Sequence, residues 1–182
     1  NEVVPTSATG TGGFLASNYD ITYVSGSLAI TARPITLVAS NRTKIYGNSL
    51  TLGNSLFTHT SGTFANSEVA TAVTLTSANG YAASTTRAVG TNSNEVVPTS
   101  ATGTGGFLAS NYDITYTAGS LEITARPITL TADYRTKVYG NSLTLGTTGF
   151  AHTVGTFANS ELATAVTLTS ANGYDASTTR AV

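Results

Sequence analysis

The chain repeats itself with a period of 93 residues, and this repeat constrains its fold more than any other feature. Residues 94–182 align with residues 1–89 without a gap, and 75 of the 89 aligned positions are identical. Because an internal repeat of this kind determines the architecture of a whole chain, we interpret the sequence as two tandem copies, 1–93 and 94–182. Copies this similar lead us to expect a longer array of which they are a part.

Apolar residues alternate with less apolar ones over residues 35–40, which is the period of a β-strand. Ile35 and Leu37 lie on one face of this strand and are unchanged in the second copy. Val38 and Ser40 lie on the other face and are replaced there by Thr and Asp. The pattern therefore predicts a strand with one buried and one solvated face.

Other differences between the copies suggest where the core lies. Ile45 corresponds to Val138 and Val69 to Leu162, and a packed core tolerates such similar volumes best, so we predict that these positions are buried. Three changes introduce a carboxylate, and we place all three on the outward face: Glu122, Asp133 and Asp175.

The sequence predicts an all-β fold of tandem, elongated β domains in a rod-like array, each an Ig-like two-sheet sandwich. The alternative is a β-grasp-like sheet around one short helix near 64–72 and 157–165, which Asn66 would cap. Strands are expected, with counterparts one period away, at 35–40, 50–58, 72–77, 82–89, 94–99, 112–117 and 120–124.

A predicted strand at 27–30 is followed almost directly by the one at 35–40. Arg33-Pro34 lies between them, with its copy at Arg126-Pro127, and proline restricts the preceding residue to an extended backbone. We interpret these pairs as stiff joints between units. On this reading 33–125 is a complete unit, 1–32 closes a preceding unit and 126–182 opens the next one. Units 1–93 and 94–182 remain an alternative phase, and the two ends could also pair between neighbouring molecules.

Composition excludes several classes of function. Only 9% of the residues are charged and the net charge is −1, without the basic clusters that phosphate binding requires. There is no Cys for disulfides or thiol chemistry, and no run approaches the ~20 apolar residues of a membrane span. We therefore expect no nucleic-acid partner and no membrane insertion.

Catalytic and metal-binding groups are sparse. Each copy has one His, His59 or His152, and the acids of the first copy, Glu2, Asp20 and Glu68, are far apart. This spacing is unlike a catalytic constellation or a calcium loop. We expect no enzymatic activity, no cofactor and no metal site.

Lysine and tyrosine each allow a specific functional hypothesis beside a purely structural one. Each copy has a single Lys, Lys44 or Lys137, which either forms an amide crosslink to an Asn or packs its stem over Tyr46 with the amine in water. Tyrosines either form a platform for sugar stacking or fill the edge of the core with their hydroxyls at the rim. The residues concerned are Tyr19, Tyr23, Tyr46 and Tyr81.

The segment Lys44-Ile45-Tyr46-Gly47, repeated around Lys137, Tyr139 and Gly140, resembles the lysine-x-tyrosine-glycine signature of the MBG (YGX-type) and YDG repeat families. A second matching motif, Asn-Tyr-Asp-Ile-Thr-Tyr, begins at residues 18 and 111. The resemblance implies an elongated, mostly β module of very large bacterial surface proteins, often with a filamentous-haemagglutinin-type secretion domain, and without known catalysis.

The function expected from this resemblance is structural. We predict a stalk or filament repeat of an extracellular bacterial adhesin, at the cell surface or in a secreted filament and compatible with a role in biofilms. It would act as a semi-rigid spacer able to self-associate, with neighbouring repeats, other filaments or cell-surface glycans as partners. The alternative is an adhesion module that binds a glycan or a protein.

Overall fold

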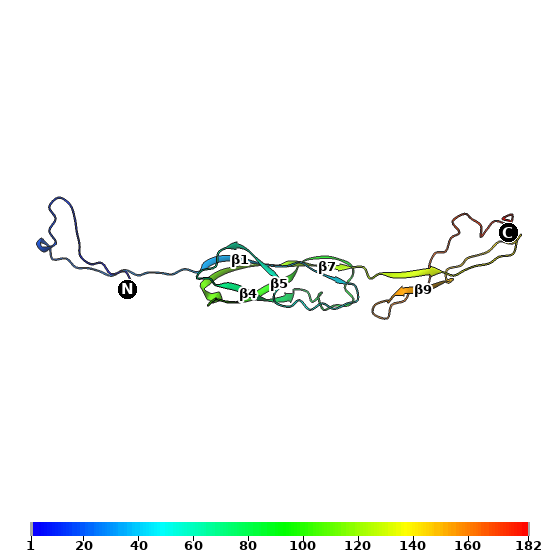
Figure 1. The fold of residues 1–182 in the computed structure, drawn as a ribbon, viewed down its shortest axis with the longest axis horizontal. Helices are drawn as coiled ribbons and strands as arrows, with labels where there is room; N and C mark the ends of the chain where they lie inside the picture. Colours follow the sequence, from blue (N-terminus) through cyan, green and yellow to red (C-terminus); the bar gives the residue numbers. More distant parts are fainter. Residues whose placement is uncertain (1, 182) are drawn as a thin grey trace.

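The computed structural model describes residues 2–181 and shows an elongated chain built from β-strands (Figure 1). A central unit contains seven of the strands, and one looped segment extends from each of its ends. The only helical elements among residues 2–181 are the 3-10 turns η1 (Ala16–Asn18) and η2 (Ala109–Asn111). The strands are β1 (Arg33–Ala39), β2 (Arg42–Ile45), β3 (Phe57–Gly62), β4 (Val69–Ser77), β5 (Gly90–Thr104), β6 (Tyr112–Thr117), β7 (Gly119–Thr124), β8 (Ile128–Ala132) and β9 (Phe150–Gly155).

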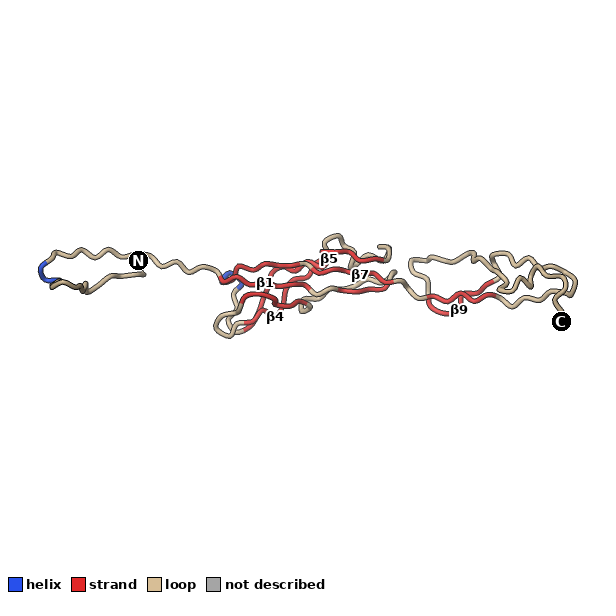
Figure 2. Tube along the Cα trace, turned by 90° about the horizontal axis from the view of Figure 1, so that it is seen from above, coloured by secondary structure: helices blue, strands red, loops and turns tan. Residues whose placement is uncertain are grey.

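Two sheets form the central unit. One has the order β3-β1-β6 and the other the order β2-β7-β5-β4, while β8 and β9 pair separately in the segment that follows. Figure 2 shows the strands of these two sheets in the middle of the molecule and β9 in the segment that follows. The prediction of an all-β fold with a two-sheet, sandwich-like arrangement is confirmed.

Two stretches of the chain, β1–β2 and β6–β7, each cross from the first sheet into the second. β1 belongs to the first sheet, and the chain continues into the second sheet as β2; β6 and β7 do the same alongside them, with β1 parallel to β6 and β2 parallel to β7. At the crossing, a Cβ on Gly119 would lie 2.6 Å from the carbonyl oxygen of Ala39, so only glycine fits. The Ser120 N–H donates to Asn41 Oδ1 at 2.8 Å.

The core lies between the two sheets. Ile35, Leu37 and Ala39 are at most 2% exposed, which confirms the predicted inward face of this strand. Leu121 and Ile123 of β7 are similarly buried, at 0% and 1%. Each large aliphatic side chain buried in this way contributes about 1.5–3 kcal/mol relative to full exposure.

The prediction that Ile45 and Val69 are buried is wrong, since they are 40% and 47% exposed. Strand alternation is the reason. Lys44 points into the unit, so its neighbour Ile45 points out. Likewise, Val69 lies between Glu68 and Ala70, which are both buried.

The outward placement of Asp175 is also wrong for a complete unit. Its counterpart Ala82 is only 4% exposed and belongs to the core. Asp175 itself is half-buried.

The short helices expected at 64–72 and 157–165 are absent from the structure, so the β-grasp alternative is wrong. Asn66 and Ser67 have φ values of 50° and 63°, and two consecutive left-handed residues cannot continue a right-handed helix. They form a turn that leads into β4. The expected strand at 82–89 is a series of turns, whereas β2 was not expected.

All strands of the two sheets lie between Arg33 and Thr124. The choice between the two possible unit boundaries stays a prediction. Within residues 2–181, no helix has the length and apolar character needed to cross a membrane.

Candidate functional site at the joint between repeats

Lys44 lies inside the central unit because β2 pairs in parallel with β7 and directs it inward. It is 7% exposed, and its Nζ donates to the carbonyl oxygens of Tyr81, Ala82 (3.0 Å) and Ser84. Burial lowers the pKa of this amine, and the negative charge of Glu95 partly offsets that effect. The expectation of an amine in water is therefore wrong for Lys44, and all three of its N–H groups are engaged by main-chain carbonyls.

Glu95 holds the same turn from the other side. It is 0% exposed and accepts hydrogen bonds from Ser77 Oγ, from the Tyr81 N–H at 3.0 Å and from Asn79 Nδ2 at 2.9 Å. Burial alone would raise the pKa of its carboxyl, but the hydrogen bonds outweigh burial and hold the pKa below its ordinary value. Lys44 and Glu95 thus fix the 77–84 turn between them.

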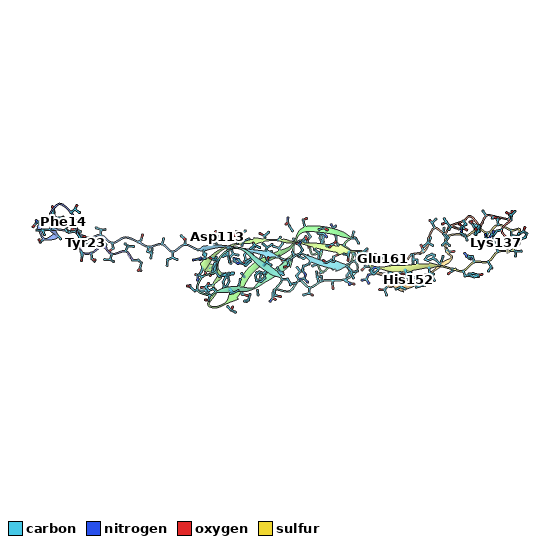
Figure 3. The ribbon with its side chains drawn as sticks, turned by 45° about the horizontal axis from the view of Figure 1, so that its top comes forward. Phe14, Tyr23, Asp113, Lys137, His152 and Glu161 are labelled. Atoms are coloured by element: carbon cyan, nitrogen blue, oxygen red, sulfur yellow. The ribbon has the colours of Figure 1, made fainter. Side chains whose placement is uncertain are left out.

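Lys137, the second signature lysine, makes the same contacts to its own turn, but within the described residues no carboxylate holds that turn from the other side as Glu95 does for Lys44. Lys137 Nζ donates to the carbonyl oxygens of Tyr174 and Ser177, the latter at 2.5 Å. Its side chain is half-buried, and Figure 3 places it toward the end of the chain that is far from the central unit.

Tyr46 and Gly47 lie at the other end of the signature motif from Lys44. There the central unit meets the segment that follows it, residues 126–181, called here the following copy. The Tyr46 N–H donates to the Thr124 carbonyl at 2.9 Å, which ties β2 to the end of β7. The Tyr46 hydroxyl donates to Glu161 of the following copy, and this bond to a carboxylate raises the pKa of the phenol. Figure 3 shows Glu161 at the end of that copy that faces the central unit.

Arg126 crosses the joint. Its Nε donates to the Tyr46 carbonyl at 2.9 Å, its Nη2 to Asn48 Oδ1, and its Nη1 to Thr156 Oγ1 at 3.4 Å. One guanidinium therefore connects the central unit with the loop that follows β9. Pro127 comes next and leads directly into β8, so no flexible linker separates the copies.

Gly47 permits the close approach of the two copies. Its φ is 87°, and a Cβ built on it would lie 2.3 Å from the Cβ of Ala158. Gly140 has the same φ of 87° but nothing within 4 Å. Asn159 adds a bond across the joint, from its Nδ2 to the Thr85 carbonyl at 3.0 Å.

The joint before the central unit is open. Arg33 Nη1 donates to Thr63 Oγ1 at 2.8 Å, as Arg126 does to its counterpart Thr156, and Pro34 pairs with Asp113 between β1 and β6. A groove lies beside Arg33, lined by residues 30–33, 65–66, 68 and 110–112.

Glu68 at the edge of this groove has a tyrosine partner of its own unit. The Tyr112 hydroxyl donates to Glu68 at 2.6 Å. Burial, and then the bond to Glu68, raise the pKa of Tyr112.

The other candidate side chains do not gather at one surface. Tyr19 stacks on Phe14 at 5.1 Å between ring centroids, and Tyr81 lies under the guanidinium of Arg87 at 4.3 Å. Figure 3 shows Phe14 and Tyr23 at the far end of the preceding segment. His59 packs against Phe64 with a centroid distance of 4.6 Å. Across residues 2–181, no three His, Asp or Glu side chains cluster in a way that could hold a metal ion.

Sequence reasoning selected the signature motif and the joint separately, and the structure brings part of them together. Tyr46 and Gly47 meet Arg126 at the joint, whereas Lys44 lies inside the unit. Glu95 and Glu161 were missed as functional positions. Their signal was that each is an acidic residue repeated unchanged in a chain with little charge.

Comparison with known protein families matches residues 35–122 to the MBG domain of the YGX type. The match confirms the resemblance drawn from the lysine-x-tyrosine-glycine motif. No curated protein and no solved structure matches the chain.

Proposed function

Because residues 35–122 match the MBG domain family of the YGX type, we propose that the chain is a stalk or filament repeat of an extracellular bacterial adhesin and acts as a semi-rigid spacer. The family match itself indicates a surface-associated repeat module. The observation that carries the proposal is the joint, where Arg126, Tyr46 and Glu161 connect successive copies without a linker.

The path of the chain through the central unit suits a spacer. The first strand, β1, begins at one end of the unit, and the last strand, β7, ends at the other (Figure 1). Adding a unit therefore adds length along one axis, as in other repeat proteins whose units contact only their neighbours.

The same path suits a module under tension. β1 pairs in parallel with β6 over six positions, and β2 with β7 over four. A pull on the two ends of the unit slides these parallel strands along each other, so the hydrogen bonds of both ladders resist together instead of opening one after another. Resistance to tension is a useful property for a stalk that holds a cell to a surface.

Location and partners belong to the same proposal. We place the chain at the bacterial cell surface or in a secreted filament, with neighbouring repeats as its first partners and other filaments or cell-surface glycans as further ones. Thr and Ser supply much of the polar surface, and the charged fraction is only 9%. Strong electrostatic repulsion between filaments lying side by side is therefore not expected.

Small-angle X-ray scattering on chains with increasing numbers of repeats tests the spacer role. We expect the longest dimension to grow linearly with repeat number, because each joint restricts bending. Growth close to the square root of repeat number, as for flexibly linked beads, would overturn the proposal.

A control addresses the joint itself. Replacing Ala125 and Arg126 by a Gly-Ser linker in every repeat should turn linear growth into the flexible regime while leaving the melting temperature of the units nearly unchanged. Micromolar binding of a glycan by a single unit would favour an adhesion module instead.

A further inference from the structure

The 77–84 turn contains a dipeptide whose chemistry the spacer role does not use. Asn79 precedes Gly80 there, and the same pair recurs once in the second copy, at Asn172 and Gly173. No other asparagine of the sequence precedes a glycine. Asparagine is a labile residue, and a following glycine favours loss of its side-chain amide because glycine has no side chain to hinder attack by its own nitrogen.

This reaction, deamidation, needs no reagent other than water. The Gly80 nitrogen forms a bond to Asn79 Cγ, the bond from Cγ to Nδ2 breaks, and the glycine N–H proton leaves with the amide as ammonia. Water then opens the cyclic imide at either carbonyl. The product at position 79 is aspartate or isoaspartate, in which the main chain runs through the former side chain.

In the folded unit, hydrogen bonds hold both reacting groups. Asn79 Nδ2 donates to Glu95 Oε2 at 2.9 Å, and the Gly80 N–H donates to the Ser77 carbonyl at 3.3 Å. For the amide to leave as ammonia it must give up the carboxylate, and for the glycine nitrogen to attack it must give up its carbonyl acceptor. The reaction therefore requires a local opening of the turn.

Glu95 also fixes the main chain on both sides of the reacting peptide group. Its Oε1 accepts from the Asn79 N–H at 3.2 Å and from the Tyr81 N–H at 3.0 Å, and its side chain is 0% exposed. Asn79 and Gly80 are themselves exposed. Water therefore reaches the dipeptide, and the hydrogen bonds of the turn, rather than burial, oppose the reaction.

These contacts lie within one complete unit. Ser77 and Glu95 come from neighbouring ends of the β4–β5 ladder, where Ser77 pairs with Val96. Lys44 holds the same turn through the Tyr81 carbonyl. All these residues lie between 44 and 96, so a neighbouring repeat supplies none of the network.

The products would not fit the closed turn. Aspartate at position 79 would place a second carboxylate where Nδ2 now donates to Glu95, and two like charges at a buried site oppose each other. Isoaspartate would add one main-chain carbon between the N–H groups of residues 79 and 81, so these two donors could no longer converge on one carboxylate oxygen. Either product would therefore weaken the closed form of the turn.

We propose that Asn79–Gly80 is a spontaneous modification site controlled by Glu95. The amide stays intact while the turn is bonded, and it is lost when the turn opens, after which the unit cannot close again with its former stability. Each unit of an array carries one such pair, so deamidation permanently marks the units that have opened. This inference does not depend on the spacer role.

Prolonged incubation of the 182-residue chain in neutral buffer, followed by tryptic peptide mass spectrometry, tests the proposal. Asn79 and Asn172 lie in different tryptic peptides, 45–87 and 138–180, so their modification is measured separately. Glu95→Gln should raise the rate at Asn79 at least about tenfold, because the amide loses its charged acceptor and the turn opens more often. Equal rates in the parent and in this variant would overturn the proposal.

Two further variants separate the turn from the core. Ser77→Ala removes one donor to Glu95 but keeps the carboxylate, so it should accelerate the reaction by less than Glu95→Gln does. Leu121→Ala removes a fully buried core side chain and leaves the bonds of the turn in place, so the rate should stay within about twofold of the parent. Acceleration by Leu121→Ala as large as that by Glu95→Gln would show that the rate follows global unfolding, and would exclude control by the carboxylate.

A mimic of the product tests the irreversible step. Asn79→Asp should lower the urea midpoint of the central unit, because it brings the second carboxylate to Glu95. Asn54→Asp introduces the same charge at an exposed position and should leave the midpoint unchanged. Equal midpoints for the two variants would mean that a deamidated unit closes normally, which contradicts the proposal.

Discussion

Residues 33–89 and 126–181 have nearly the same sequence, yet the structure holds the first as half of a closed unit and the second as an open one. Both form the same antiparallel ladder, β1–β3 or β8–β9, and both place a lysine against the same turn. Only the first has parallel neighbours, which come from residues 112–124. Local sequence is therefore sufficient for the antiparallel ladder and the lysine contacts, whereas burial of the core requires the strands of residues 90–124.

The largest expected effect separates a core leucine of the closed central unit, Leu121, from its exposed counterpart in the preceding segment, Leu28. Leu121→Ala should destabilise the central unit by about 2–5 kcal/mol, because it removes a fully buried side chain and leaves a cavity. Leu28→Ala, the same change at a position that is 63% exposed, should alter the unfolding free energy of the central unit by no more than about 0.5 kcal/mol. Urea denaturation of both variants measures this, and equal losses would mean that the central unit does not owe its stability to closure.

The second prediction concerns the buried carboxylate of the closed copy. Glu95→Gln should cost about 1–3 kcal/mol, because an amide NH₂ would face N–H donors that now meet a carboxylate. Glu2→Gln at the exposed counterpart should cost almost nothing in the central unit.

This carboxylate also predicts a pH dependence. Its pKa is lower in the folded unit than the ordinary value of 4.5, so its contribution is fully present above about pH 4.5 and is lost as the pH falls through the folded pKa. Stability measured by urea denaturation between about pH 7 and about pH 3 should fall more in the parent than in Glu95→Gln. Parallel curves would show that Glu95 does not titrate in this way.

The third prediction compares two glycines with the same backbone. Gly47→Ala and Gly140→Ala both place a Cβ at a φ of 87°, which costs about 1–3 kcal/mol locally. Only Gly47→Ala would also collide with Ala158. Residual dipolar couplings should therefore show a changed orientation between the central unit and the following copy for Gly47→Ala alone; a similar change in both variants would contradict the role assigned to the joint.

The smallest effect is expected from the joint arginine. Arg126→Ala removes three hydrogen bonds but no core contact, so the unfolding midpoint should hardly move, while the angular spread seen by scattering should widen. Arg33→Ala, at the open joint, should leave that spread unchanged. A large stability loss in Arg126→Ala would instead make this residue part of the unit's core.

The sequence correctly predicted which side chains face the core where a strand shows a clear period of two. Ile35, Leu37 and Ala39 carried a clear period of two, and their inward face is confirmed. Similar side-chain volume between the copies was a poor guide at Ile45, because the inward residue of that short strand is Lys44, whose charge is satisfied by the carbonyls of a turn distant in sequence.

Two other features depend on backbone conformation or on distant pairing, which local sequence patterns do not show. The stretch 64–72 has helix-favouring composition, but the left-handed residues Asn66 and Ser67 redirect it. The position of Tyr46 at the joint could not be predicted either, because it depends on the parallel pairing of Ile45 with Thr124, 79 residues later in the chain. Such pairings between distant segments leave no local periodic signal.

One acidic position has a consequence for the array as a whole. Its two copies are bonded differently: Glu68 by Tyr112 of its own unit, and Glu161 by Tyr46 of the unit before it. A carboxylate has two oxygens, so in a continuous array one side chain can serve both phenols. We therefore expect nearest-neighbour cooperativity: a unit that opens changes the hydrogen bonding available to the unit before it, and boundaries between open and closed units should be fewer than independent units would give.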